Sequence, residues 1–187
     1  CRMPLCYGGG IRTSEQAIKI FQLGVEKIAL SSKAIEDPSI ISEISIKVGA
    51  QSVIVVLDVK KNRFSKKYSI YTKNGTLKSK YNPIDFSKRI QQEGCGEIVI
   101  NSIDKDGGMN GYDYEIIDQI RNVVSIPLTV LGGAGSLDDI GGLINEHGII
   151  GASAGSLFVF KGKYRAVLIN YPNSDEKETL IKKYFTR

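Results

Sequence analysis

Apolar positions along the chain switch between strand-like and helix-like spacing, and this alternation predicts the order of its secondary structure. Residues 53–57 are five consecutive apolar residues, four of them β-branched, as in a parallel strand buried on both faces. Residues 37–49 show helical spacing of apolar side chains, with Asp37 as the cap and Pro38 in the first turn. Further strands are expected over 1–7, 27–31, 97–103, 127–131 and 149–154, and further helices over 13–23, 83–93, 113–123, 138–146 and 176–185. Strands that alternate with helices in this way predict a parallel sheet with helical cover.

Two glycine clusters repeat along the chain at an offset of 124 residues. Each cluster follows a short apolar run and precedes a helical pattern, so each half contains a strand, a glycine loop, a helix and a second strand. Glycine lets the backbone approach a bulky anion, and the free N–H groups beyond such a loop can bind phosphate. The equivalent positions are Gly9 and Gly133, Gly24 and Gly148, Ser31 and Gly155, and Ser32 and Ser156. Two copies predict two phosphate sites, and therefore a substrate with a phosphate at each end.

The number of strand–helix units limits the fold to two α/β classes. Six units fit an open doubly wound sheet, and they also fit part of a closed (β/α)₈ TIM barrel, which takes about 250 residues and eight units. The repeat pairs the first two strands with the last two, whereas the strands at 53–57 and 97–103 have no earlier equivalents. We therefore expect a (β/α)₈ TIM barrel whose first two βα units are absent from this chain. Residues 1–187 are expected to form this single, partial domain, with 161–187 as a divergent C-terminal segment.

Composition and charge exclude several classes of protein. The chain has 187 residues, of which 42% are hydrophobic, as in an ordinary globular domain. It contains no apolar run of about 18 residues and no visible signal peptide, so no membrane association is expected. The three cysteines form no metal motif, and their odd number, together with the missing signal, predicts a cytoplasmic protein.

The net charge of +5 is concentrated between Lys60 and Lys80, where eight residues are basic and none is acidic. Residues 67–80 of this basic run are expected to form a hairpin that turns at Asn74-Gly75. Such a run fits nucleic acid, an anionic small molecule or a solvated hairpin surface. Because no nucleic-acid-binding module is recognisable, we favour a phosphorylated small molecule and expect no nucleic-acid partner.

Asp58 is the first candidate for chemistry, because it directly follows the buried run 53–57. Active sites of such barrels gather at the C-terminal ends of the strands. A carboxylate at that position is partly desolvated, which suits a general acid or base. The alternative is a structural aspartate that caps the chain or forms a salt bridge with Lys60.

A second polar cluster, at 101–108, begins in the last residues of the strand expected at 97–103 and continues into the loop after it. It contains Asn101 and the Asp106-Gly107 turn, and we expect it to contact the ligand. His147 is the only histidine and precedes a strand, so we expect it on the surface of the opposite, non-catalytic face. A Ser-His-Asp or Cys-His arrangement is therefore not expected, and neither is a metal or another cofactor.

These stretches resemble the HisF family, the cyclase subunits of imidazole glycerol phosphate synthase. The resemblance covers nearly the whole chain to Phe160 and is most specific at GEIVINSIDKDGGMNGYD (96–113). The other matching stretches are YGGGI (7–11), KIALSSKAIEDPS (27–39), VVLDVK (55–60), LGGAG (131–135) and GSLFVF (155–160). The resemblance implies a (β/α)₈ barrel with an internal half-barrel repeat, of which this chain corresponds to the third to the eighth strand.

The resemblance also implies a reaction. A glutamine amidotransferase partner makes ammonia, which crosses the barrel and reacts with a ribulosyl aminoimidazole carboxamide nucleotide that carries two phosphates. Cyclisation and cleavage give imidazole glycerol phosphate and an aminoimidazole carboxamide ribotide. Asp58 matches one of two catalytic aspartates, and the other belongs to the family's first strand, which this chain lacks.

The resemblance further assigns the binding residues. Lys27 and Glu97 match charged residues where the family admits ammonia. Gly9, Gly10, Ser31 and Ser32 match one phosphate site, and Asp106, Gly107, Gly133, Gly155 and Ser156 match the other, with Asn101 beside them.

Some positions differ from the family and leave two further interpretations open. The family usually has Asn at Ser31 and Ser at Leu131, and the stretch 161–172 is unlike histidine-pathway members. That stretch is more similar to HisF-like proteins found with surface-polysaccharide amidation enzymes, which are thought to pass ammonia to a sugar amidotransferase. The third interpretation is a chain that cannot close its barrel and is inactive, because two unpaired sheet edges favour aggregation.

Overall fold

The computed structural model describes residues 3–185, and its centre is a curled, mainly parallel sheet. The strands lie in the order β1-β2-β3-β6-β7-β8, and every neighbouring pair on this path is parallel. Their bounds are β1 Cys6–Gly8, β2 Lys27–Leu30, β3 Val53–Lys61, β6 Glu97–Ser102, β7 Leu128–Leu131 and β8 Gly151–Ala152. Since consecutive units add consecutive strands, the topology is that of a partial (β/α)₈ TIM barrel, as the sequence predicts.

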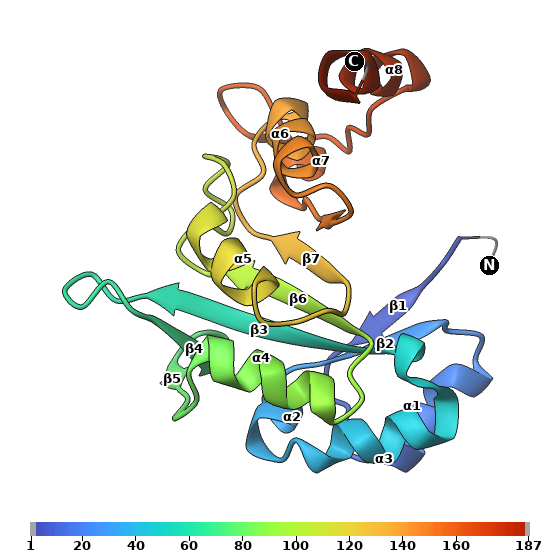
Figure 1. The fold of residues 1–187 in the computed structure, drawn as a ribbon. Helices are drawn as coiled ribbons and strands as arrows, with labels where there is room; N and C mark the ends of the chain where they lie inside the picture. Colours follow the sequence, from blue (N-terminus) through green and yellow to red (C-terminus); the bar gives the residue numbers. More distant parts are fainter. Residues whose placement is uncertain (1–2, 186–187) are drawn as a thin grey trace.

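Helices cover one face of this sheet. Their bounds are α1 Ser14–Gln22, α2 Ser32–Glu36, α3 Ser39–Val48, α4 Pro83–Gln92, α5 Tyr114–Arg121, α6 Leu137–His147, α7 Ser156–Val159 and α8 Ser174–Phe185, with a short 3₁₀ turn, η1, at Ala50–Ser52. Figure 1 shows α1, α3 and α4 along one side of β2 and β3. On β3, Val53, Val55, Leu57 and Val59 are fully buried beneath this helical layer, whereas Val56 and Asp58 point to the other face and are half-buried. The polar candidates therefore lie on the inner face of the curl.

The two helices that follow the glycine loops both begin with a capping box. The expected capping box of α1 is present, with Thr13 accepting from the N–H of Gln16. In α6, Ser136 and Asp139 form a second capping box that the sequence reading missed. These boxes satisfy backbone N–H groups that a helix start leaves free, and they fix where each glycine loop ends.

The backbone confirms the internal repeat. Gly9 and Gly133 have φ values of 108° and 113°, and Gly24 and Gly148 also have positive φ. Ser31 and Gly155 share an unusual conformation, with φ and ψ of −134° and −93° in one and −106° and −73° in the other. Each is followed by a one-turn helix, α2 or α7, which the hydrophobic pattern alone did not predict.

The basic run forms a hairpin, but the turn is longer than predicted. Strands β4 (Tyr68–Thr72) and β5 (Leu77–Lys78) are antiparallel, and the loop between them takes residues 73–76 instead of two residues. The backbone is left-handed at Lys73 as well as at the predicted Asn74-Gly75 turn. Strand β4 also pairs with the end of β3, which places the hairpin at the rim beside Asp58.

The bounds of several other helices and strands differ by a few residues from those predicted from the sequence. β1 begins at Cys6, and the expected start of this strand at residues 1–2 lies outside the described residues. α3 begins at Ser39 and its N-cap residue is Pro38 instead of the expected Asp37. Asp37 lies one residue further upstream and accepts a hydrogen bond from the Ser39 N–H at 3.3 Å. β8 is reduced to two residues.

The C-terminal segment forms a small unit on the outside of the fold. Strands β9 (Phe160–Lys161) and β10 (Ala166–Val167) form a short antiparallel hairpin, and α8 follows. Figure 1 shows α8 beyond α6, at the end of the molecule opposite α1 and α3. The ammonium of Lys183 on α8 lies 2.7 Å from the carboxylate of Asp138 on α6. Within residues 3–185, no helix has the length and apolar character needed to cross a membrane.

Candidate functional site

Asp58 lies at the centre of the inner face, where three strands meet. Asn101 on β6 and Tyr71 on β4 are its register partners on either side. The Asn101 amide donates a hydrogen bond to Asp58 Oδ1 at 2.8 Å. In the part of the chain that the structure describes, this is the only hydrogen bond to the carboxylate side chain, so Oδ2 remains available to a ligand.

Asn101 has one free hydrogen-bonding atom. Its Oδ1 is buried and, within residues 3–185, has no hydrogen-bond partner. A buried acceptor without a partner costs free energy of folding, on the order of 1–3 kcal/mol. The unpaired acceptor lies against the Gly132 backbone, where a Cβ built on Gly132 would be 3.1 Å away, so Asn101 contacts Asp58 through its amide nitrogen and the C-terminal glycine loop through its oxygen.

The N-terminal glycine pocket is a cavity of about 460 Å³ at the C-terminal ends of β1 and β2. Its lining includes Gly8, Gly9, Gly10, Arg12, Ser31, Ser32, Lys33 and Val56. A Cβ built on Gly9 or Gly10 would meet no atom within 4 Å, so the backbone here faces open space. Val56 precedes Asp58 by two residues on the same strand face, which connects this pocket to the carboxylate.

The C-terminal glycine pocket is smaller, about 40 Å³, and lies at the ends of β7 and β8. Its lining includes Asp106, Gly107, Leu131, Gly132, Gly133, Ser153, Gly155 and Ser156. The Gly133 backbone packs closely against the loop after β6, since its carbonyl accepts from the Gly111 N–H at 2.9 Å. Leu131 is the register partner of Asn101, which connects this pocket to Asp58 from the other side.

Both glycine pockets therefore open at the same edge of the sheet, with Asp58 and Asn101 between them. Strands β2 and β7 are three strand spacings apart, roughly 14 Å along the sheet. The structure thus brings together the residues that the sequence assigned to two phosphate sites and to acid–base chemistry. A ligand that reaches both pockets must be elongated.

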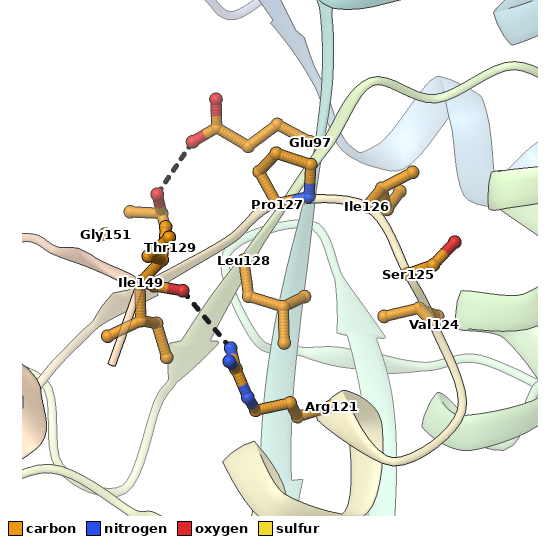
Figure 2. A pocket seen from close by; sticks show the side chains of 11 residues that line it. Glu97, Arg121, Val124, Ser125, Ile126, Pro127, Leu128, Thr129, Ile149 and Gly151 are labelled. Atoms are coloured by element: carbon orange, nitrogen blue, oxygen red, sulfur yellow. Dashed lines mark hydrogen bonds between the residues drawn. The ribbon is translucent and has the colours of Figure 1, made fainter. Parts of the chain in front are cut away.

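Lys27 and Glu97 lie at the opposite end of the strands. The Lys27 ammonium is 2.7 Å from Glu97 Oε2. Glu97 Oε1 accepts a hydrogen bond from the Thr129 hydroxyl at 2.7 Å (Figure 2). Asn101 is four positions after Glu97 on β6, which is roughly 13 Å along the strand. This ion pair is therefore distinct from the Asp58 site.

A cavity of about 450 Å³ opens beside Glu97 (Figure 2). Arg121 reaches across it and donates to the Ile149 carbonyl at 3.3 Å. Thr129 was not predicted from the sequence. Its side chain faces the inside of the sheet from β7, as that of Glu97 does from β6. Cys6 on β1 is the register partner of Lys27 and is exposed. Partial desolvation by the surrounding atoms, together with the Glu97 charge, raises the pKa of its thiol.

The basic run lines a third cavity at the rim, of about 700 Å³. Its lining includes Lys60, Lys61, Arg63, Lys66, Tyr68, Asp104, Lys105 and Asp113. Two of these residues are held by other contacts, since Lys61 pairs with Glu115 and the Tyr68 hydroxyl donates to Asp113 at 2.8 Å. Burial and this bond to Asp113 raise the pKa of Tyr68. The basic side chains of this cavity therefore come mainly from the end of β3 and the loop that leads to β4, and most of them are exposed.

The structure corrects the placement of His147. This residue ends α6 and is buried, with 9% of its surface exposed, because its ring stacks on Tyr114 of α5 at 5.7 Å. Its Nδ1 lies 3.7 Å from Asp118 Oδ1. Among the described residues, no group of three or more His, Cys, Asp or Glu side chains is arranged to hold a metal ion.

Comparison with known proteins connects this geometry to one family. Residues 1–165 match the family model described as "Histidine biosynthesis protein". A protein of Vibrio vulnificus named "Putative imidazole glycerol phosphate synthase subunit hisF3" is 55% identical over 97% of this chain and 70% of its own length. A Leptospira interrogans protein named "Putative imidazole glycerol phosphate synthase subunit HisF" is 53% identical, again over 97% of this chain, and over 71% of its own length.

The name of a third relative lacks the word "Putative". The "Imidazole glycerol phosphate synthase subunit HisF" of Alkaliphilus metalliredigens is 38% identical over 83% of this chain and 62% of its own length. Taken with the family match, these identities show that the chain is a HisF-like member of the histidine biosynthesis protein family.

Proposed function

We propose that this chain is a cyclase subunit of the imidazole glycerol phosphate synthase type. It binds a ribulosyl aminoimidazole carboxamide nucleotide with one phosphate in each glycine pocket. Ammonia from a glutaminase partner then drives cyclisation and cleavage. The observation that carries the proposal is the placement of Asp58 between two equivalent glycine pockets at one edge of the sheet.

In this proposal Asp58 is the acid–base group. The carboxylate is half-buried and fixed through Oδ1 by Asn101, so Oδ2 is the atom that exchanges a proton with the reacting nitrogen. The phosphates act as handles at both ends of the substrate, which holds the reacting centre over Asp58 and reduces the entropic cost of reaching the transition state. The family's second catalytic aspartate has no counterpart in residues 1–187, so it is not assigned here.

Lys27 and Glu97 form the ammonia entrance in this proposal. Their ion pair lies on the inner face at the end of the strands remote from Asp58, where a glutaminase subunit would dock. The word "subunit" in the relatives' names supports a partner of this kind. A cytoplasmic location belongs to the same proposal.

A second candidate function is that of an ammonia-conducting partner in the amidation of a surface-polysaccharide sugar. It is supported by the resemblance of residues 161–172 to HisF-like proteins found with surface-polysaccharide amidation enzymes. The relatives at 53–55% identity match 97% of the chain, so their similarity extends into this segment. In that case the inner face would conduct ammonia without binding the bisphosphate nucleotide.

Turnover separates the two functions. The full-length protein is assayed with the bisphosphate nucleotide and ammonium chloride, and imidazole glycerol phosphate is quantified. The cyclase proposal predicts ammonium-dependent product that the Asp58→Asn variant does not form. The absence of product from the folded wild-type protein, with and without a glutaminase subunit, would refute it in favour of the second function.

A further inference from the structure

The two glycine pockets are equivalent in backbone but differ in charge. The N-terminal pocket is lined by Arg12 and Lys33. Positions 124 residues further along carry Ser136 and Leu157, so the repeat does not preserve either cation. Among the described residues that line the C-terminal pocket, none is basic, and Asp106 adds a negative charge.

The C-terminal hairpin brings a cation to this pocket from a distant part of the sequence. The β9–β10 turn lies against the loop after β6, and the Arg165 guanidinium donates through Nη2 to the Gly107 carbonyl at 2.8 Å. Gly107 belongs to the lining of the C-terminal pocket, and a Cβ built on it would lie 4.0 Å from the Ser156 hydroxyl. The guanidinium is thus at the wall of a pocket that has no cation of its own.

Arg165 is held in this position by two further features. Its guanidinium carbon lies 4.9 Å from the centre of the Phe160 ring, so the charged group stacks on the base of the hairpin. Its backbone has a φ of 49°, an uncommon conformation for a residue other than glycine, and it closes the turn by donating from its N–H to the Gly162 carbonyl. Within residues 3–185 no carboxylate forms an ion pair with Arg165, and the bond to Gly107 uses one of five guanidinium N–H donors.

We propose that Arg165 supplies the positive charge of the C-terminal glycine pocket and binds a phosphate ester there. The charge replaces the one that Arg12 and Lys33 provide in the N-terminal pocket. Guanidinium suits this role because its planar array of donors fits two phosphate oxygens at once. This inference rests on the proposed function, since it assumes that the C-terminal pocket takes a phosphate. It also gives the divergent segment a role in the site.

The test is a phosphate titration followed by NMR at constant ionic strength. Inorganic phosphate is added to the full-length protein, and the amide signals of Gly9 and Gly133 report the two pockets separately. In the wild type both signals should shift and saturate. In Arg165→Gln the affinity read at Gly133 should fall about tenfold, as expected for the loss of a charge-assisted contact. The affinity read at Gly9 should stay within twofold.

Two further variants separate phosphate binding by Arg165 from effects of net charge and of changes in the turn. Lys163→Gln removes the same charge from the same turn without a contact to the pocket, and both affinities should stay within twofold. Arg165→Gly removes the guanidinium, and glycine adopts the positive φ of this position without strain. This variant should therefore show the same loss of phosphate affinity at Gly133 even if Arg165→Gln disturbs the turn. If Lys163→Gln and Arg165→Gly lowered the phosphate affinity at Gly133 equally, the effect would come from net charge alone, and the inference would be overturned.

The outcome also distinguishes this inference from the proposed function. If phosphate shifts Gly133 in the wild type and equally in Arg165→Gly, the pocket binds phosphate but Arg165 has no part in it. If phosphate leaves Gly133 unshifted in the wild type, the phosphate site of the proposed function fails, and the inference fails with it.

Discussion

Gly9 and Gly133 allow a direct test of how the repeat is built, because they have nearly the same backbone and different surroundings. Their φ values are 108° and 113°. A Cβ at Gly9 would meet no atom within 4 Å, whereas a Cβ at Gly133 would lie 2.2 Å from the Gly111 carbonyl oxygen and 3.3 Å from Lys105 Cβ. We therefore expect Gly9→Ala to report backbone strain alone and Gly133→Ala to report strain and overlap together.

The magnitude follows from these contacts. An alanine held at such a φ costs about 1–3 kcal/mol, and this term is common to both variants. At Gly133 the loop at Gly111 must also move, because 2.2 Å is more than 1 Å inside ordinary contact. That movement weakens the bond from the Gly111 N–H to the Gly133 carbonyl, worth about 1 kcal/mol, and adds an overpacking cost of about 1–3 kcal/mol. Gly133→Ala should lower the free energy of unfolding by about 2–4 kcal/mol more than Gly9→Ala does.

The assay is equilibrium unfolding in urea, monitored by circular dichroism, on the wild type and both variants. The change common to both variants measures the strain, and the difference between them measures the contact of Gly133 with the loop after β6. A difference below about 0.5 kcal/mol would refute this account of the close approach at Gly133. It would also mean that the C-terminal glycine pocket is looser than the structure shows.

Three further predictions concern the inner face. Asp58→Asn should lower turnover about 100-fold to 10,000-fold and leave the free energy of unfolding within about 1 kcal/mol of the wild type, as steady-state kinetics and urea unfolding would show; full turnover would remove Asp58 from the acid–base role. Asn101→Leu should lower kcat more than it changes KM, since it frees Asp58 Oδ1 from its 2.8 Å bond, and a change in KM alone would instead indicate a binding role. Glu97→Gln should lower the pKa of Cys6, because it removes a negative charge that disfavours the thiolate and leaves the Lys27 charge that favours it. The pKa is measured from the rate of Cys6 alkylation at different pH values, followed by mass spectrometry. A rate curve that moves to higher pH would contradict the prediction.

The sequence predicted those parts of the fold that depend on local chemistry. The glycine pairs revealed the repeat because a positive φ restricts the residue type, and the backbone at Gly9 and Gly133 confirms it. The run 53–57 was predicted as a buried strand because its apolar pattern is continuous, and β3 covers it. The sequence also placed Asp58 at the C-terminal end of this strand, and the structure adds that its side chain lies on the inner face.

The parts that were missed depend on contacts between distant residues. Sequence alone placed His147 on the surface, whereas the last turn of α6 packs against Tyr114, 33 positions earlier in the chain. The bond between Asp58 and Asn101 depends on the register of β3 with β6, which no local pattern specifies. Arg165 was part of a turn without assigned chemistry, because its contact with Gly107 forms only when the hairpin folds back over the loop after β6.

The central claim is that one ligand bridges the two glycine pockets across Asp58. A crystal structure of the full-length protein with the bisphosphate nucleotide tests it most directly. The account predicts one phosphate at the backbone of Gly9 and Ser32, the other at Gly133 and Ser156, and the reacting atoms over Asp58. Both phosphates in a single pocket, or a ligand bound away from Asp58, would contradict it.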